Sequence, residues 1–168
     1  NYALDALTSG DYNVGVGLNV LSANTTGGNN VAVGQAALLT NTTASDNTAL
    51  GHYALLLNTT GANNVAVGSL ALDANTTADG NTAVGQGAMS GTTTGANNIA
   101  IGLSSLYTNT TGASNTALGQ GALFANTTAN LNTAVGFGAM YANTTGTRNI
   151  GIGANAYNAS DTESDNVA

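Results

Sequence analysis

Few residues of this chain belong to the types that carry out acid–base or nucleophilic chemistry. His52 is the only histidine, Arg148 is the only basic residue, and there is no cysteine. His52 shares its position in a repeat with Gln35, Ser69 and Gln86 of other copies, so it is most simply a solvated surface residue. An active site needs one unique constellation of groups, whereas the serines and aspartates here stand in repeating columns. We therefore expect no catalytic or cofactor-binding residue and no enzymatic activity.

Acidic side chains are the candidate metal ligands, and they are scattered over predicted turns. The glycine-rich nonapeptide that binds calcium in parallel β-rolls is absent. We therefore expect no metal site and assign the acidic groups to solvation, with a structural calcium as the alternative. The residues concerned are Asp46, Asp73, Asp79, Asp161, Glu163 and Asp165.

The triplet Asn-Thr-Thr recurs along the chain, and it is both a turn former and an N-glycosylation sequon. Either the Asn and Thr side chains stack and cap a corner of the repeat, or a secreted protein carries a stripe of glycans there. A third interpretation is that the stacked threonines bind ice or a glycan. Adjacent threonines that point in opposite directions argue against an ice-binding face. The possible glycosylation sites are Asn24, Asn41, Asn58, Asn75, Asn109, Asn126, Asn143 and Asn158.

The composition excludes several classes of partner. Only 5% of the 168 residues are charged, against roughly 25% in an ordinary domain, and the net charge is -7. A chain with one arginine cannot neutralise a row of phosphates or dock on anionic lipid. No apolar run approaches the roughly 20 residues of a spanning helix. We expect no nucleic-acid partner and no membrane insertion of this segment.

A period of 17 residues organises the whole chain, which we take as a single repeat domain over residues 1–168. Each copy carries the motif Asn-x-Ala-x-Gly or a close variant, with no insertion or deletion between copies. The closing glycines are Gly17, Gly34, Gly51, Gly68, Gly85, Gly102, Gly119, Gly136 and Gly153. The asparagines are Asn13, Asn30, Asn47, Asn64, Asn81, Asn98, Asn115, Asn132, Asn149 and Asn166, and we expect their side-chain amides to form a ladder.

Alternation within the motif predicts a short strand. In the segment 30–34 two valines stand two residues apart with an alanine between them, which is the period of a β-strand and not of a helix. A large aliphatic precedes each glycine and a Leu, Met or Tyr follows it by four, so each copy has two apolar columns. Stacked copies bury what one copy cannot. We predict an all-β parallel β-solenoid of about ten coils and about 48 Å in length, at about 4.8 Å per coil.

One further column suggests contact with another molecule. It follows the Leu/Met column by one residue, so strand alternation places it on the outside, although a bend in the corner could instead tuck it into the core. Apolar side chains there would mark an interface between chains or a ligand surface. Its members are Leu39, Leu56, Tyr107, Phe124 and Tyr141.

The motif Asn-Val-Ala-Val-Gly at 30–34 and Asn-Ile-Ala-Ile-Gly at 98–102 resembles the head repeats of trimeric autotransporter adhesins. The fuller unit that begins at Asn81 and Asn132 is similar to tracts in bacterial surface proteins and phage tail-fibre-like proteins. The resemblance covers essentially the whole chain and implies a left-handed solenoid, a trimer and a place on a cell or virion surface. The 17-residue coil is longer than the typical adhesin-head repeat.

These features together predict a structural or adhesive extracellular rod, part of a cell-surface or virion fibre, that associates with itself through its small-residue or Leu/aromatic face. A host surface or a glycan is a further possible partner. Two alternatives remain open. Strand edges without polar caps would allow end-to-end polymerisation into a filament, and the threonine stripe would bind ice or a glycan.

Overall fold

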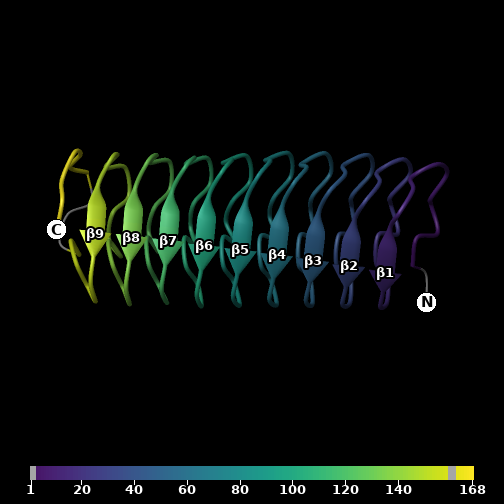
Figure 1. Ribbon diagram of the computed structural model, residues 1–168, viewed down its shortest axis with the longest axis horizontal. Helices are drawn as coiled ribbons and strands as arrows, with labels where there is room; N and C mark the ends of the chain where they lie inside the picture. Colours follow the sequence, from purple (N-terminus) through teal and green to yellow (C-terminus); the bar gives the residue numbers. More distant parts are fainter. Residues whose placement is uncertain (1–2, 159–161) are drawn as a thin grey trace.

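The computed structural model describes residues 3–158 and 162–168, and every regular element in this part of the chain is a β-strand. Nine three-residue strands form one parallel sheet in the order of the sequence (Figure 1). The predicted all-β parallel solenoid with a 17-residue period is confirmed, with about eight turns. The strands are β1 (Val14–Val16), β2 (Val31–Val33), β3 (Thr48–Leu50), β4 (Val65–Val67), β5 (Thr82–Val84), β6 (Ile99–Ile101), β7 (Thr116–Leu118), β8 (Thr133–Val135) and β9 (Ile150–Ile152).

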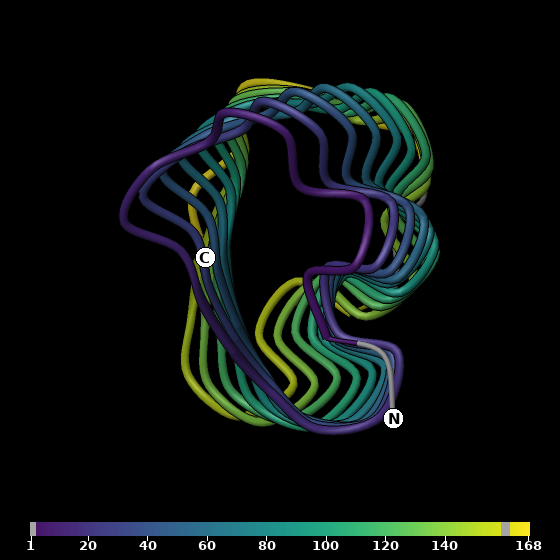
Figure 2. The ribbon, with the colours of Figure 1, turned by 90° about the vertical axis from the view of Figure 1, so that its right-hand side faces the viewer.

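The stacking register follows the sequence period. Each residue of a strand pairs with the residue 17 positions later, as Val16 does with Val33, and a bridge from Ile150 to Val167 begins the next rung. With the N-terminal end toward the viewer, the chain runs anticlockwise as it recedes, so the coils wind with a left hand (Figure 2).

The shape that each coil repeats depends on corners where the backbone is left-handed. At the end of each strand a glycine is required: Gly34 has φ 131°, and a Cβ on it would lie 2.4 Å from the carbonyl oxygen of Gly51. Three later positions in each coil also have positive φ, such as Tyr53 at 60°, Leu55 at 51° and Asn63 at 60°. Left-handed backbone is unfavourable for residues that carry a Cβ. Burial of the leucine side chains, which are fully inaccessible, offsets that cost.

The core consists of stacked alanines facing stacked leucines and methionines. In β2 the middle residue Ala32 is fully buried, whereas Val33 beside it is 37% exposed. The Leu/Met column from Leu21 to Met140, which includes Leu72 and Met89, is fully buried. The aliphatic before each glycine lies on the outer side of the strand, because the alanine takes the place in the core.

The reason lies in the width of the coil. The Leu/Met side chains cross the interior and reach the opposite strand, so the strand residue that faces them must be small. A Cβ built on Gly151 would lie 2.7 Å from Cγ of Met140, and one on Gly15 would lie 3.5 Å from Leu4. The small-residue column therefore belongs to the interior and is not a lateral packing face, which also corrects the expectation of self-association through it.

Candidate interaction surfaces

The two asparagine columns converge on the same corner of each coil. The side chain of Asn47 makes its hydrogen bonds within the chain. Its Oδ1 accepts a hydrogen bond from the backbone N–H of Asn64 at 3.0 Å, and its Nδ2 donates to the carbonyl of Gly61 at 2.9 Å. Asn58, from the second column, donates to the same carbonyl at 2.9 Å and to Oδ1 of Asn41 at 3.0 Å. From Asn30 to Asn149 the first column is buried, while Asn13 and Asn166 at its ends are half-buried. Both columns hold the fold together and offer little to a ligand.

The sequon asparagines cannot carry glycans in this fold. From Asn24 to Asn143 their side chains are fully inaccessible, and Nδ2 of Asn58 uses both hydrogens within the chain. A glycan on such a nitrogen would have to displace the column, whose side chains are hydrogen-bonded within the chain. Asn158 is exposed, but the remainder of its sequon, 159–160, lies outside the described residues, as does Asp161.

The two threonine columns differ in accessibility. The first, represented by Thr59, is half-buried except at Thr110, and the hydroxyl of Thr59 donates to the carbonyl of Thr76 in the next coil at 2.9 Å. The second, from Thr26 to Thr145, is exposed in every coil. Only one line of threonine side chains therefore faces water with free access.

Potential catalytic and metal-binding groups stay dispersed. His52 is exposed and stacks on Tyr53 with ring centroids 3.7 Å apart. Among the described residues, no three His, Cys, Asp or Glu side chains are grouped so that they could hold a metal ion. In the same residues no helix is long and apolar enough to cross a membrane.

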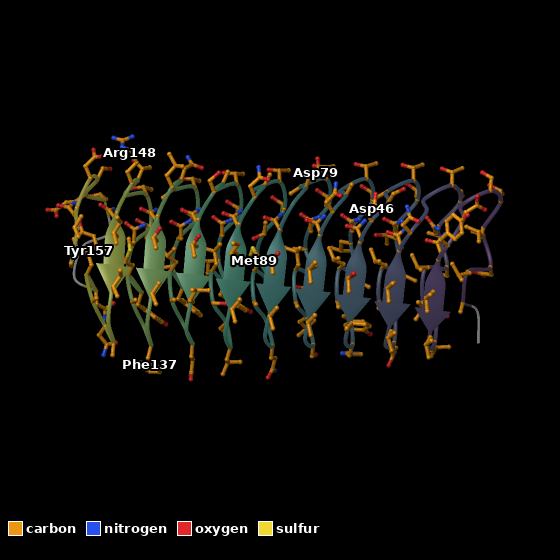
Figure 3. All side chains as sticks on the ribbon, viewed as in Figure 1. Asp46, Asp79, Met89, Phe137, Arg148 and Tyr157 are labelled. Atoms are coloured by element: carbon orange, nitrogen blue, oxygen red, sulfur yellow. The ribbon has the colours of Figure 1, made fainter. Side chains whose placement is uncertain are left out.

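One ion pair lies at the edge of the rod. Arg148 donates from Nη2 to Oδ2 of Asp165 at 2.7 Å, and both side chains are exposed. This hydrogen bond, more than the Coulombic attraction, lowers the pKa of Asp165 below its ordinary value. Figure 3 shows Arg148 and Asp79 at the edge where the strands begin, and Phe137 at the opposite edge.

The outer face of the sheet is the first candidate interaction surface. We call it the sheet face; it consists of the first and third residues of β1 to β9, all of them Val, Ile, Leu or Thr. Ile101 is 43% exposed and Ile152 is 63% exposed. Over eight strand spacings the face extends about 38 Å, and its width of three residues is about 10 Å. A strip of about 400 Å² is comparable to the largest apolar patches that monomers expose.

The second candidate surface is a groove along the C-terminal half of the rod. Tyr107, Phe124 and Tyr141 stack along the rod with centroids 5.2 and 4.8 Å apart and ring tilts of 5° and 4°. Tyr107 and Tyr141 are partly exposed and Phe124 is half-buried, as are Leu39 and Leu56 of the same column. Three adjoining cavities of about 350, 210 and 270 Å³ lie beside these rings.

The groove exists because large rings in one column of the repeat lie over small residues in another column. Each large ring packs over a small residue of the preceding coil: a Cβ on Gly87 would lie 3.3 Å from Tyr107, and one on Gly121 would lie 3.5 Å from Tyr141. Earlier in the chain the column of Gly87 holds Tyr53 and Leu70, and the aromatic column holds Asp73 and Ser90. The sequence contained this signal, since one column becomes small where the other becomes aromatic.

Successive cavities share lining residues, so they form one continuous groove, which we call the aromatic groove. Its floor is Gly87, Ser104, Gly121 and Gly138; one wall is the ring stack; the other is Leu103, Phe137 and the amides of Gln86 and Gln120. Leu70 and Ser90 close one end, and Asn155 and Asn158 close the other. No lining residue is charged. Neither the glycines nor the glutamines were among the residues predicted from sequence.

The chain matches no protein-family model, no curated protein and no solved structure. Its function is therefore argued from the sheet face and the aromatic groove.

Proposed function

We propose that this chain is a non-enzymatic structural and adhesive rod, exposed on a cell or virion surface, that associates with further copies of itself through the sheet face. The observation that carries this proposal is the aliphatic character of that face in every coil. Its members are Val, Ile, Leu or Thr in all nine strands, with no charged residue among them.

The organisation of the sheet supports a covered outer face. Parallel sheets occur almost only where both faces are covered, and here the chain covers one face with its own core. Contact between two copies would bury about 400 Å² on each, about 800 Å² in total, and contribute at most about 20 kcal/mol at 25 cal/mol per Å². Association costs about 4–15 kcal/mol. Contact between two such strips is therefore large enough to offset this cost.

A second copy of the chain is the partner that fits this face best. The strip is corrugated with one ridge per coil, and another copy carries ridges of identical spacing, so two strips match along their full length. The net charge of -7 opposes contact between copies at long range, but no charged residue lies in the sheet face itself. The resemblance to adhesin heads and tail-fibre-like repeats, which form oligomeric rods on surfaces, points in the same direction.

Mass in solution tests the proposal. Sedimentation velocity of the wild type should give a discrete oligomer, and Ile101→Lys should reduce it to a 16.3 kDa monomer because it places a charge in the centre of the sheet face. Thr94→Lys is the matched control, since it adds the same charge in the exposed threonine column of the preceding coil. A monomeric wild type, or an oligomer that both variants leave intact, would overturn the proposal.

A further inference from the structure

We propose that the aromatic groove binds a linear, uncharged oligosaccharide that lies along the rod. The inference deepens the adhesive part of the proposed function by naming a ligand class and a site. The groove is separate from the sheet face, so binding and self-association can be tested independently.

The groove has the dimensions of a site for a chain molecule. It extends from Leu70 to Asn155, which are five coils apart, or about 24 Å at about 4.8 Å per coil. Its cavities adjoin one another, because Leu103 and Phe124 line both the first and the second, and Gln120 and Tyr141 line both the second and the third. A ligand of several units can therefore lie in it without a break.

The free polar groups of the groove fit hydroxyl-bearing ligands. Within the described residues, no hydrogen bond engages the side-chain amides of Gln86 and Gln120 or the hydroxyls of Tyr107 and Tyr141. An amide offers two donors and one acceptor, and a tyrosine hydroxyl offers one donor and acceptor sites. Sugar hydroxyls also donate and accept, so each contact can be paired. An aliphatic ligand would leave these groups unpaired, which costs about 1–3 kcal/mol for each one that becomes buried.

The apolar groups of the groove fit the carbon faces of sugar rings. The stacked aromatic rings cover the faces of one another, so only the ring edges line most of the groove. A whole ring face is free only where the stack ends. After Tyr141 the next place in the column is held by Asn158, and a Cβ on Gly138 would meet only the amide of Asn155. The cavity of about 270 Å³ there, flanked by Phe137, is the place that a fourth ring would occupy. A terminal sugar ring fits between Tyr141 and these amides.

Charge selects against ionic ligands. No lining residue carries a charge, so an ionic group in the groove would lose water without gaining a counter-charge. The net charge of -7 also repels polyanions such as sulfated glycans. The preferred ligand is therefore neutral.

Calorimetric titration with cellohexaose, maltohexaose and N-acetylchitohexaose tests the inference. At least one should bind saturably. Tyr107→Leu and Gln120→Ala should each weaken binding tenfold or more. Leucine already occupies the column of Tyr107 at Leu39, so that variant retains the fold. Gln35→Ala is the matched control, because Gln35 has the column position of Gln120 but lies outside the groove, and it should bind like the wild type.

Three results would overturn the inference: no heat with any of these hexasaccharides up to about 10 mM, equal weakening by Gln35→Ala, or tighter binding of a sulfated hexasaccharide. Repeating the titration with Ile101→Lys distinguishes a failure of the oligosaccharide site from a failure of the assembly proposal. Undiminished binding by a monomeric Ile101→Lys places the site on the single rod. Loss of binding in that variant, with its fold intact by circular dichroism, would contradict a site within one chain.

Discussion

Replacing Thr92 by asparagine should stabilise the protein. The second asparagine column is interrupted at this position, and the buried Oδ1 of Asn75 below it has no hydrogen-bond partner. On the other side, Nδ2 of Asn109 lies 3.5 Å from Oγ1 of Thr92, at the limit of a hydrogen bond. Where the column is intact, as between Asn126 and Asn109, the corresponding distance is 2.8 Å.

The gain follows from the bonds that an asparagine would make. Its Nδ2 would donate to Oδ1 of Asn75 and to the carbonyl of Gly95, and its Oδ1 would accept from Asn109. The backbone already fits, since N–H of Thr92 donates to the carbonyl of Met89 at 3.0 Å as in the other coils. Satisfying one buried acceptor is worth about 1–3 kcal/mol. Ordering the longer side chain costs up to about 1 kcal/mol, so Thr92→Asn should gain about 1–2 kcal/mol.

Urea and thermal unfolding measure this change. Each kcal/mol raises Tm by about 2–4 °C in a chain of this length. Thr92→Ser is the control, because it leaves the column interrupted and should give no gain. The mirror variant Asn58→Thr leaves Oδ1 of Asn41 without its donor and should lose about 1–3 kcal/mol. An unchanged or lower stability for Thr92→Asn would refute the assignment of a stabilising role to the second asparagine column.

Three further variants test the packing and the ion pair. Ala83→Val should lower the free energy of unfolding by about 1–3 kcal/mol through overpacking. Val84→Ala, at the surface of the isolated rod, should change it by about 0.5 kcal/mol. A larger loss for Val84→Ala than for Ala83→Val in urea unfolding would contradict the inward alanine column. Leu72→Ala should cost about 2–5 kcal/mol in the same assay, and a loss below about 1 kcal/mol would show that the Leu/Met column is not the core. In an NMR titration the pKa of Asp165 should lie below its ordinary value and return to it in Arg148→Gln. Because the folded-state pKa is lowered, any stabilisation by this pair is present above the unfolded pKa and is lost as pH falls through the folded one; an unchanged titration in Arg148→Gln would rule out the pair in solution.

The period of 17 was sufficient to predict the architecture. A strict period in which the alternating motif Asn-x-Ala-x-Gly recurs predicts one coil per repeat, and parallel pairing of each residue with its counterpart 17 positions later follows from stacking. The requirement for glycine after each strand follows from the close approach of Gly34 to the next coil. These features depend on local geometry that every copy repeats.

The direction of each strand face could not be predicted from alternation alone. Alternation shows that Ala32 and Val33 point to opposite sides, but it does not say which side is the interior. The width of the coil decides this, because Leu38 and its counterparts fill the space next to the alanines. The restriction of one column to Ala and Gly, beside a column that accepts Val, Ile or Leu, was the available evidence of crowding.

The aromatic groove was predicted only in part. The aromatic column was named as a candidate interface, with burial in the core as the alternative, but a groove needs a second column that becomes small in the same coils. Gly87 and Gly121 stand 20 residues before Tyr107 and Tyr141, which is one coil and three residues, and only the folded coil shows that these positions touch.

Self-association through the sheet face can be measured most directly with single spin labels, since the chain has no native cysteine. Val84→Cys places a label in the sheet face, and Thr77→Cys places one in the exposed threonine column. Pulsed electron paramagnetic resonance on each singly labelled protein reports only distances between chains. A short intermolecular distance at position 84 and a longer or undetectable one at position 77 is the predicted result. No dipolar coupling at position 84, or a shorter distance at position 77, would contradict assembly through the sheet face.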